Sequence, residues 1–124
     1  MHPFKRAMHW ASERKGLAWI DVSQIVEAAI RMDTPLATRL RASVAPSALP
    51  PIPQGFEPHH QAVFTVEARG FLERVAGRVE RNIYKDDVPD QILVEAARFD
   101  LGREALAVMG LGDHHVEEAA QGDP

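Results

Sequence analysis

Histidine is the first side chain to consider as a source of chemistry, because the chain has six histidines and no cysteine. Two histidines bind one metal ion when they lie on the same face of a helix, as in the HExxH spacing, which this sequence lacks. Adjacent histidines on a helix point about 100° apart and cannot hold one ion together. The best local cluster is His114 or His115 with Glu118, and no third ligand is evident, so we predict no metal site. The histidines are His2, His9, His59, His60, His114 and His115.

Serine could act as a nucleophile only beside a histidine and a carboxylate in an activating context, and no serine here lies in a nucleophile-elbow motif. The carboxylate pair Asp86-Asp87 resembles a helix cap, and Glu117-Glu118 resembles part of a solvated tail. The glycines of 110–112 follow a predicted helix instead of opening one after a strand, so they form no phosphate loop. We therefore predict no catalytic residue, no cofactor and no enzymatic activity. The serines are Ser12, Ser23, Ser43 and Ser47.

Arginines and glycines on one side of the segment 58–84 form the first candidate binding surface. Arg74, Arg78 and Arg81 fall on a narrow arc of the predicted helix, and Gly70 and Gly77 lie a heptad apart nearby. A glycine inside a helix costs about 1 kcal/mol relative to alanine, so two on one side indicate that another backbone comes close. We predict that a partner protein or a second copy of the chain binds there. The alternative is that other helices of the same chain lie across these glycines.

Three arginines of the N-terminal half form a second candidate surface, for nucleic acid. The segment 24–44 has the outline of a helix-turn-helix, with two short helices and a tight turn before Pro35. Arg31, Arg39 and Arg41 would supply its phosphate contacts. The turn lacks the glycine found in many such motifs, and similar helical hairpins are common in proteins that do not bind DNA.

The segment 58–84 is the longest with one sustained periodicity, and it predicts one long central helix. At about 1.5 Å per residue this helix would run roughly 40 Å. The first part, 62–66, is β-branched and alternating, which leaves a short strand there as the alternative. The apolar stripe of the predicted helix consists of Phe64, Ala68, Phe71, Leu72, Val75, Ala76, Val79 and Ile83.

Shorter helices are predicted on both sides of this segment. Asp21 and Gln24 have the spacing of a capping box that starts a helix with apolar residues up to Ile30. Asp87 and Asp100 are each predicted to cap a helix in the C-terminal half. Five prolines within 46–58 exclude a helix or a central strand and predict an extended arm. The remaining predicted segments are a helix over 3–15 that ends before Gly16, a helix from Pro35 to Val44, and a frayed acidic tail over 113–124.

Composition places the chain in the class of single-domain globular proteins. Its 124 residues suffice for one core, and 45% hydrophobic with 26% charged residues is ordinary for such a domain. No apolar run reaches the roughly 18 residues of a membrane span, so we expect a soluble, cytoplasmic protein. The net charge of −4 is uneven. Residues 1–45 carry seven basic and four acidic side chains, whereas 46–124 carry seven basic and fourteen acidic ones.

These observations predict an all-α single domain of about five helices packed around the long helix 58–84. An N-terminal group at 1–45 and a C-terminal group at 59–112 would be joined by the arm at 46–58 and followed by the tail at 113–124. We expect a non-enzymatic protein-interaction module, such as an adaptor, an inhibitor or a small regulatory subunit. The alternative is a small nucleic-acid-binding regulator that uses the basic N-terminal half.

Overall fold

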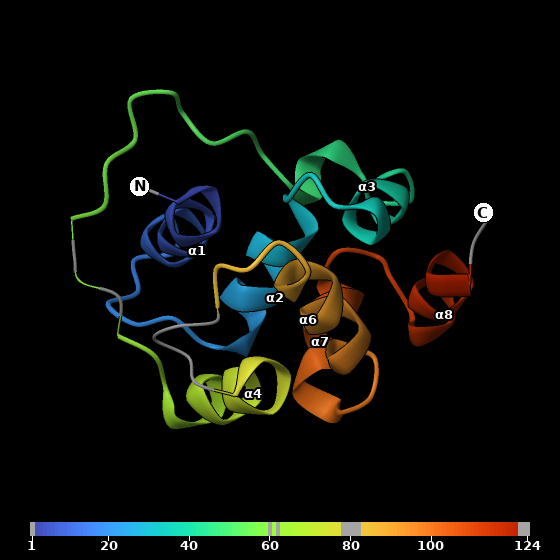
Figure 1. Ribbon diagram of the computed structural model, residues 1–124. Coiled ribbons are helices and arrows are strands. Elements are labelled where there is room, and N and C mark those ends of the chain that lie inside the picture. The colour runs from blue at the N-terminus through green and yellow to red at the C-terminus, as the bar shows by residue number, and fades with distance from the viewer. Residues whose placement is uncertain (1, 60, 62, 78–82, 122–124) are drawn as a thin grey trace.

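Packed α-helices form the regular structure of the protein, which is described here from a computed structural model covering residues 2–59, 61, 63–77 and 83–121 (Figure 1). The predicted all-α class is confirmed, with more helices than the five expected. No helix in these ranges combines the length and the hydrophobicity needed to cross a bilayer. The helices are α1 (Pro3–Glu13), α2 (Val22–Ile30), α3 (Pro35–Arg41), α4 (Val66–Ala76), α6 (Val88–Ala96), α7 (Asp100–Val108) and α8 (Asp113–Gln121).

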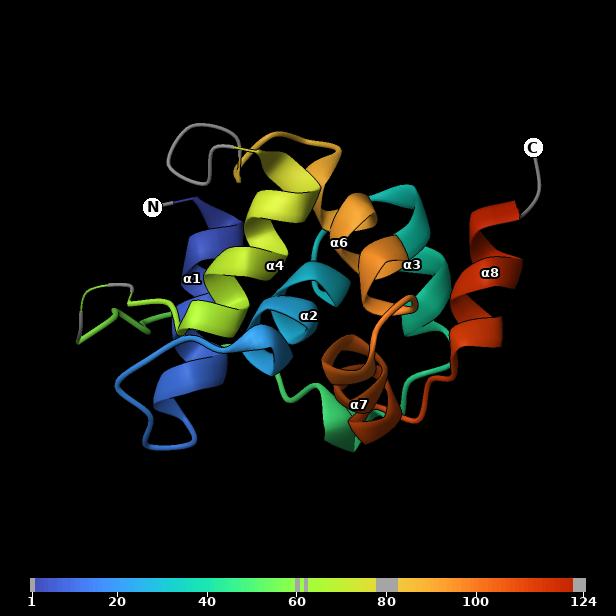
Figure 2. The ribbon, with the colours of Figure 1, turned by 90° about the horizontal axis from the view of Figure 1, so that it is seen from below.

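Helix α2 occupies the centre of the molecule, where it contacts α1, α3, α4, α6 and α7. Figure 2 shows α1 and α4 on one side of α2, with α6 and α7 on the other. Every residue of α2 except Ser23 is buried. Ile25, Val26 and Ile30 supply the apolar bulk, and Ala28 and Ala29 let neighbouring helices come close. The predicted long helix is therefore not the centre of the fold.

Both ends of α2 receive polar contacts from other segments of the chain. At its beginning, Asp21 and Gln24 form the predicted capping box. The hydroxyl of Thr65 donates to Asp21 Oδ1 at 2.9 Å. At its end, Arg41 Nη1 donates to the carbonyls of Ile30 at 2.8 Å and Met32 at 2.6 Å. These contacts satisfy backbone groups that a helix terminus leaves without partners inside the helix.

The prediction of one helix over 58–84 is wrong, because α4 is much shorter. Thr65 caps its beginning by accepting a hydrogen bond from Ala68 N at 3.1 Å. Phe64 pairs with Ile20 in an isolated parallel bridge, so the strand alternative for 62–66 is realised at one residue, with residue 62 outside the described part. Gly77 ends the helix with φ +72°, a conformation that residues with a side chain rarely adopt. Residues 78–82 lie outside the described ranges.

The arm over 46–58 wraps around the outside of α1 and contains only a short 3₁₀ turn, Pro46–Ala48 (Figure 1). The Arg6 guanidinium holds it by donating to the carbonyls of Pro53 and Gln54. Farther along, the ring of Phe56 packs edge-on against Trp10 with 5.2 Å between centroids. Side chains of α1 thus provide the polar and aromatic contacts that a proline-rich segment cannot make with its own backbone.

Three further predictions about the C-terminal half need correction. Phe99, not Asp100, is the cap residue of α7, and Asp100 is its first residue. Asp87 precedes α6 as expected but makes no capping hydrogen bond through its side chain. The predicted frayed tail is a helix, α8, which packs against α3 and α6 and buries Val116. Helix α8 needs only one buried apolar residue and its alanines to be stable, because packing against the neighbouring helices stabilises it.

Gly102 marks the closest approach between α6 and α7. A Cβ atom added there would overlap backbone atoms of Ala96, whereas a Cβ atom at Gly70 on α4 would meet nothing within 4 Å. We expect Gly102→Ala to destabilise the protein by about 1–3 kcal/mol through overpacking. Gly70→Ala should instead stabilise it by about 0.5–1 kcal/mol through helix propensity. Urea melts of both variants measure the difference, and equal effects would contradict this packing.

Candidate functional site

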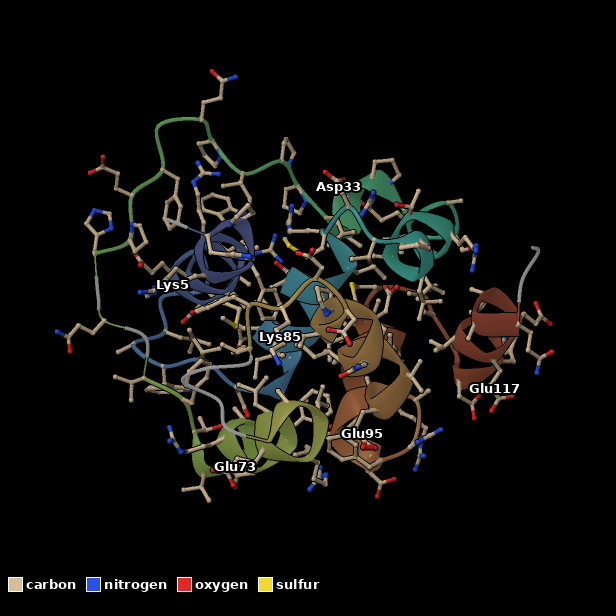
Figure 3. The ribbon with its side chains drawn as sticks, in the orientation of Figure 1. Lys5, Asp33, Glu73, Lys85, Glu95 and Glu117 are labelled. Carbon is tan, nitrogen blue, oxygen red and sulfur yellow. The ribbon has the colours of Figure 1, made fainter. Side chains whose placement is uncertain are left out.

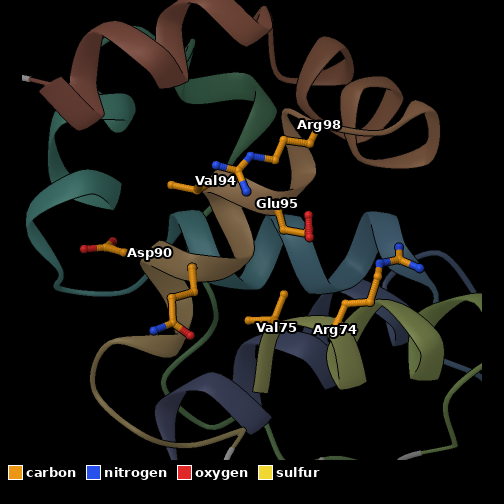
Figure 4. A pocket seen from close by; sticks show the side chains of 7 residues that line it. Arg74, Val75, Asp90, Val94, Glu95 and Arg98 are labelled. Carbon is orange, nitrogen blue, oxygen red and sulfur yellow. The ribbon is translucent and has the colours of Figure 1, made fainter. Parts of the chain in front are cut away.

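A groove between α4 and α6 is the candidate site to which the predicted arginine surface contributes (Figure 4). Its volume is about 340 Å³. Val75 from α4 and Val94 from α6 give it an apolar floor, and both side chains are half-buried. The charged and polar residues that line it are Arg74, Asp90, Gln91, Glu95 and Arg98.

Charges of both signs flank this apolar floor. Figure 4 shows Glu95 projecting from α6 toward Val75 and Arg74 on α4, with Asp90 nearer the beginning of α6 and Arg98 just beyond its end. The half-buried carboxylate of Glu95 makes no hydrogen bond or ion pair within the described ranges, and the exposed Arg98 side chain likewise has none there. Opposite charges that remain unpaired beside apolar side chains are available to a complementary surface.

Arg74 is held in place by an aromatic ring. Its guanidinium carbon lies 4.8 Å from the centroid of the Phe99 ring, within the range of a cation–π contact. Phe99 also packs against Phe71 of α4, with 5.1 Å between ring centroids. The aromatic pair therefore joins α4 to the segment that follows α6 and holds Arg74 at the rim of the groove.

The two glycines of the predicted surface have different roles. Gly70 lies one turn before Arg74 on α4, and no other segment in the described part of the chain lies across it. At Gly70 the alternative of intramolecular packing is therefore not realised. Gly77 ends the helix through its positive φ, so its backbone conformation explains it without a close neighbour. Arg78 and Arg81 lie outside the described residues.

Arg31, from the second predicted surface, belongs to a cluster of charges on α2. Glu27, only 6% exposed, lies between Arg14 and Arg31, with N–O distances of 2.5 Å to Arg14 and 3.5 Å to Arg31. Burial lowers the pKa of the Arg31 guanidinium from its usual value, and the negative charge of Glu27 acts in the opposite direction. This cluster neutralises a buried carboxylate in the middle of the fold.

Arg39 and Arg41, the other arginines of the nucleic-acid hypothesis, donate to backbone carbonyls. Arg39 Nη1 bonds to Ala119 O in α8 at 2.7 Å. Arg41 bonds to the carbonyls of Ile30 and Met32 at the end of α2. Both guanidinium groups thus already have structural partners, and phosphate contacts would have to use their remaining N–H groups. The nucleic-acid hypothesis stays a prediction.

Titratable side chains elsewhere do not assemble into a metal site among the residues that the structure describes. The rings of His114 and His115 are tilted by 36° with centroids 4.0 Å apart, and His115 Nδ1 accepts a hydrogen bond from Gly112 N. His59 instead contacts Glu13 of α1 through both its backbone N and its ring, the latter at 2.8 Å. This contact fixes the end of the arm.

Exposed apolar side chains gather around the beginning of α2, a surface that the sequence did not indicate. Asp21 and the residues next to it line a depression of about 220 Å³ with Leu101 and Val108 of α7. On the other side of Asp21, Ile20 N donates to Val63 O at 2.7 Å. The large apolar residues exposed within the described ranges are Trp19, Val63, Val66, Leu101 and Val108.

Sequence reasoning found Arg74 and missed the α6 side of the groove. Glu95 and Arg98 stand in an ordinary amphipathic segment, where charged residues are expected on the solvent side. Only the packing of α6 beside α4 gives them a common surface with Val75.

The chain matches no protein-family model, and comparisons with curated proteins and with solved structures found no match.

The contacts of Arg39 and Arg41 predict different effects on stability. Arg41→Ala removes a charged donor from two carbonyls at the end of the central helix, and we expect a loss of about 1.5–3 kcal/mol. Arg39→Ala is the control, because its partner lies in the peripheral helix α8, and its urea midpoint should stay close to that of the parent. Equal midpoints for the two variants would contradict these roles.

The same two variants test the nucleic-acid hypothesis. Phosphate contacts would give binding to duplex or single-stranded probes that weakens steeply with salt, and replacing both arginines would reduce the salt slope. Because both groups bond to carbonyls, we expect no such binding in a fluorescence anisotropy titration. Sub-micromolar, salt-dependent binding would revive the hypothesis.

Proposed function

We propose that this protein is a non-enzymatic protein-interaction module that binds an amphipathic helix of another protein along the groove between α4 and α6. The observation that carries the proposal is the apolar floor of Val75 and Val94, flanked by Glu95 (Figure 3) and Arg98, whose side chains make no hydrogen bond or ion pair within the described residues. A helix placed in a groove uses apolar anchors for affinity and charged flanks for register.

The partner helix should complement the groove residue by residue. An apolar side chain would pack on Val75 and Val94. An acidic side chain would face Arg98, and a basic one would face Glu95. Gly70 supports this arrangement, because the open space beside it leaves room for another backbone to approach α4.

A matched pair of valine variants tests the proposal. Val94→Asp places a carboxylate on the floor of the groove, and we expect it to weaken partner binding by about tenfold or more, since a buried unpaired charge is costly. Val108→Asp, on the 77% exposed side chain of α7, is the control and should bind as the parent does. Partners are captured from the native host with each bait, identified, and titrated against each variant. Circular dichroism and urea melts establish that both variants are folded.

A second pair of variants reverses a charge and leaves Val75 and Val94 unchanged. Arg98→Glu should weaken the complex, whereas Lys15→Glu, exposed in the turn after α1, should leave it unchanged. Binding of the identified partner segment should shift the amide NMR resonances of α4 and α6.

If only Val108→Asp loses binding, the interface lies instead on the exposed apolar surface at the beginning of α2. Self-association of the purified protein that Arg98→Glu abolishes would identify a second copy as the occupant.

A further inference from the structure

The depression of about 220 Å³ between the beginning of α2 and α7, here called the α2–α7 depression, is separate from the α4–α6 groove. Figure 2 shows α7 directly beside α2, and the two helices are in contact. Ser23 lines the depression and is the one residue of α2 that is not buried, so the central helix reaches the surface here. The volume is below the roughly 300 Å³ at which small-molecule pockets begin, so it suits one side chain of a partner better than a free ligand.

An apolar stripe on α7 forms one side of the α2–α7 depression. Leu101, Ala105 and Val108 have the spacing i, i+4 and i+7, which places them on one face of the helix. Val22 of α2 lies on the other side of the depression. Leu101 is 40% exposed and Val108 is 77% exposed, whereas Ala105 and Val22 are buried. A partner that covered the stripe would remove apolar surface from water, which is favourable.

Both charged side chains of the described lining are acidic, namely Asp21 and Glu104. Asp21 already caps α2, because its Oδ1 accepts from Val22 N at 2.8 Å and from the Thr65 hydroxyl at 2.9 Å. Glu104 is exposed, and its carboxylate makes no hydrogen bond or ion pair within the described ranges. The carboxylate available to a partner is therefore that of Glu104, and Asp21 adds negative potential.

The occupant that fits these features is a cation on a long aliphatic side chain. Arginine meets both requirements, because its planar guanidinium can donate two parallel hydrogen bonds to a carboxylate while its methylene groups pack on apolar side chains. Arginine is also enriched among the residues that contribute most to protein interfaces. Nucleic acids and anionic lipids carry phosphates, which the carboxylates of Asp21 and Glu104 would repel. The partner is therefore a protein.

A second copy of the chain is a poor source of this arginine. Its excess of basic charge lies in residues 1–45, and the five arginines there already contact other groups of their own chain. The partner that we infer is therefore a different protein. The five arginines are Arg6, Arg14, Arg31, Arg39 and Arg41.

We propose that the α2–α7 depression receives an arginine side chain from a basic segment of another protein, with its guanidinium on Glu104 and its methylene groups on Leu101 and Val108. Apolar residues beside that arginine would cover the stripe of α7. This partner differs from the helix that binds the α4–α6 groove, so Val108→Asp remains a control for that helix.

The capped tripeptide acetyl-Leu-Arg-Leu-amide is the probe that tests this site. One matched control has citrulline in place of arginine, which keeps the shape of the side chain and removes its charge. The other, acetyl-Ser-Arg-Ser-amide, keeps the charge and lacks the apolar side chains. Each peptide is titrated into the ¹⁵N-labelled full-length protein. We expect the probe to bind about tenfold or more tightly than either control, to shift amide resonances of α7 and the beginning of α2, and to bind more weakly as salt is added.

Two pairs of variants locate the probe. Glu104→Gln removes the charge at nearly constant shape and should weaken binding by about tenfold, whereas Glu117→Gln on α8 should bind as the parent does. Val108→Ser interrupts the apolar stripe and should also weaken binding, whereas Ala107→Ser, outside the lining, should not. All four side chains are exposed, so we expect each variant to fold, and urea melts measure this.

Binding that requires the guanidinium, Glu104 and Val108 supports the proposal. Absence of binding, equal affinity for the citrulline peptide, or full affinity in Glu104→Gln would overturn it. Resonance shifts confined to α4 and α6 would also overturn it, because the probe would then occupy the other groove. Self-association of the purified protein that Glu104→Gln abolishes would overturn it too, by identifying a second copy as the occupant. The outcome is independent of whether a partner helix binds along Val75 and Val94.

Discussion

Burial of α2, in which every residue except Ser23 is buried, is the constraint on which the rest of the structure depends. A helix surrounded by other helices cannot rely on water to satisfy the backbone groups at its ends, so the chain must supply partners for them. Asp21 does so at the beginning by accepting from Val22 N, with Thr65 donating to the same carboxylate, and Arg41 does so at the end by donating to two carbonyls. These contacts hold the start of α4 and the end of α3 against the two ends of α2.

Buried charge imposes a second requirement at the same helix. Glu27 lies on a face of α2 that is covered by other segments, and an unpaired carboxylate there would be strongly unfavourable. Arg14 approaches it from the end of α1, and Arg31 approaches it from the next turn of α2. Arg14 makes the closer contact, and Arg31 Nε and Nη2 are buried without a hydrogen bond within the described residues.

The α4–α6 groove and the depression beneath the arm have different linings. The α4–α6 groove is open, and its floor of two valines suits a helix that brings its own apolar surface. The depression beneath the arm is lined by apolar residues and by three arginines that contact other groups of the chain, namely Arg6, Arg31 and Arg41. Phe99 sets the geometry of the first site by packing on Phe71 and Arg74, and Arg6 sets that of the second by holding the arm.

Features that depend on neighbours along the chain were predictable from the sequence. The capping box at Asp21, the periodicity from Val22 to Ile30 and the irregular proline-rich arm follow from local hydrogen bonding and backbone sterics, so they were predictable. The length of α4 was not. A glycine within an amphipathic pattern is compatible with a helix, and only the conformation of Gly77 in the folded chain ends it.

Tertiary structure alone decided which helix is central and which charged side chains share a surface. Periodicity reports that a helix has an apolar face but not how many neighbours cover it, so the nine residues of α2 gave no sign of their central position. Arg74 was identified from its own helix, whereas Glu95 and Arg98 join it only because α6 packs beside α4. The helix-turn-helix outline predicts a phosphate contact for Arg31. Its pair with Glu27 is local, at i,i+4, whereas the approach of Arg14 to the same carboxylate depends on tertiary packing.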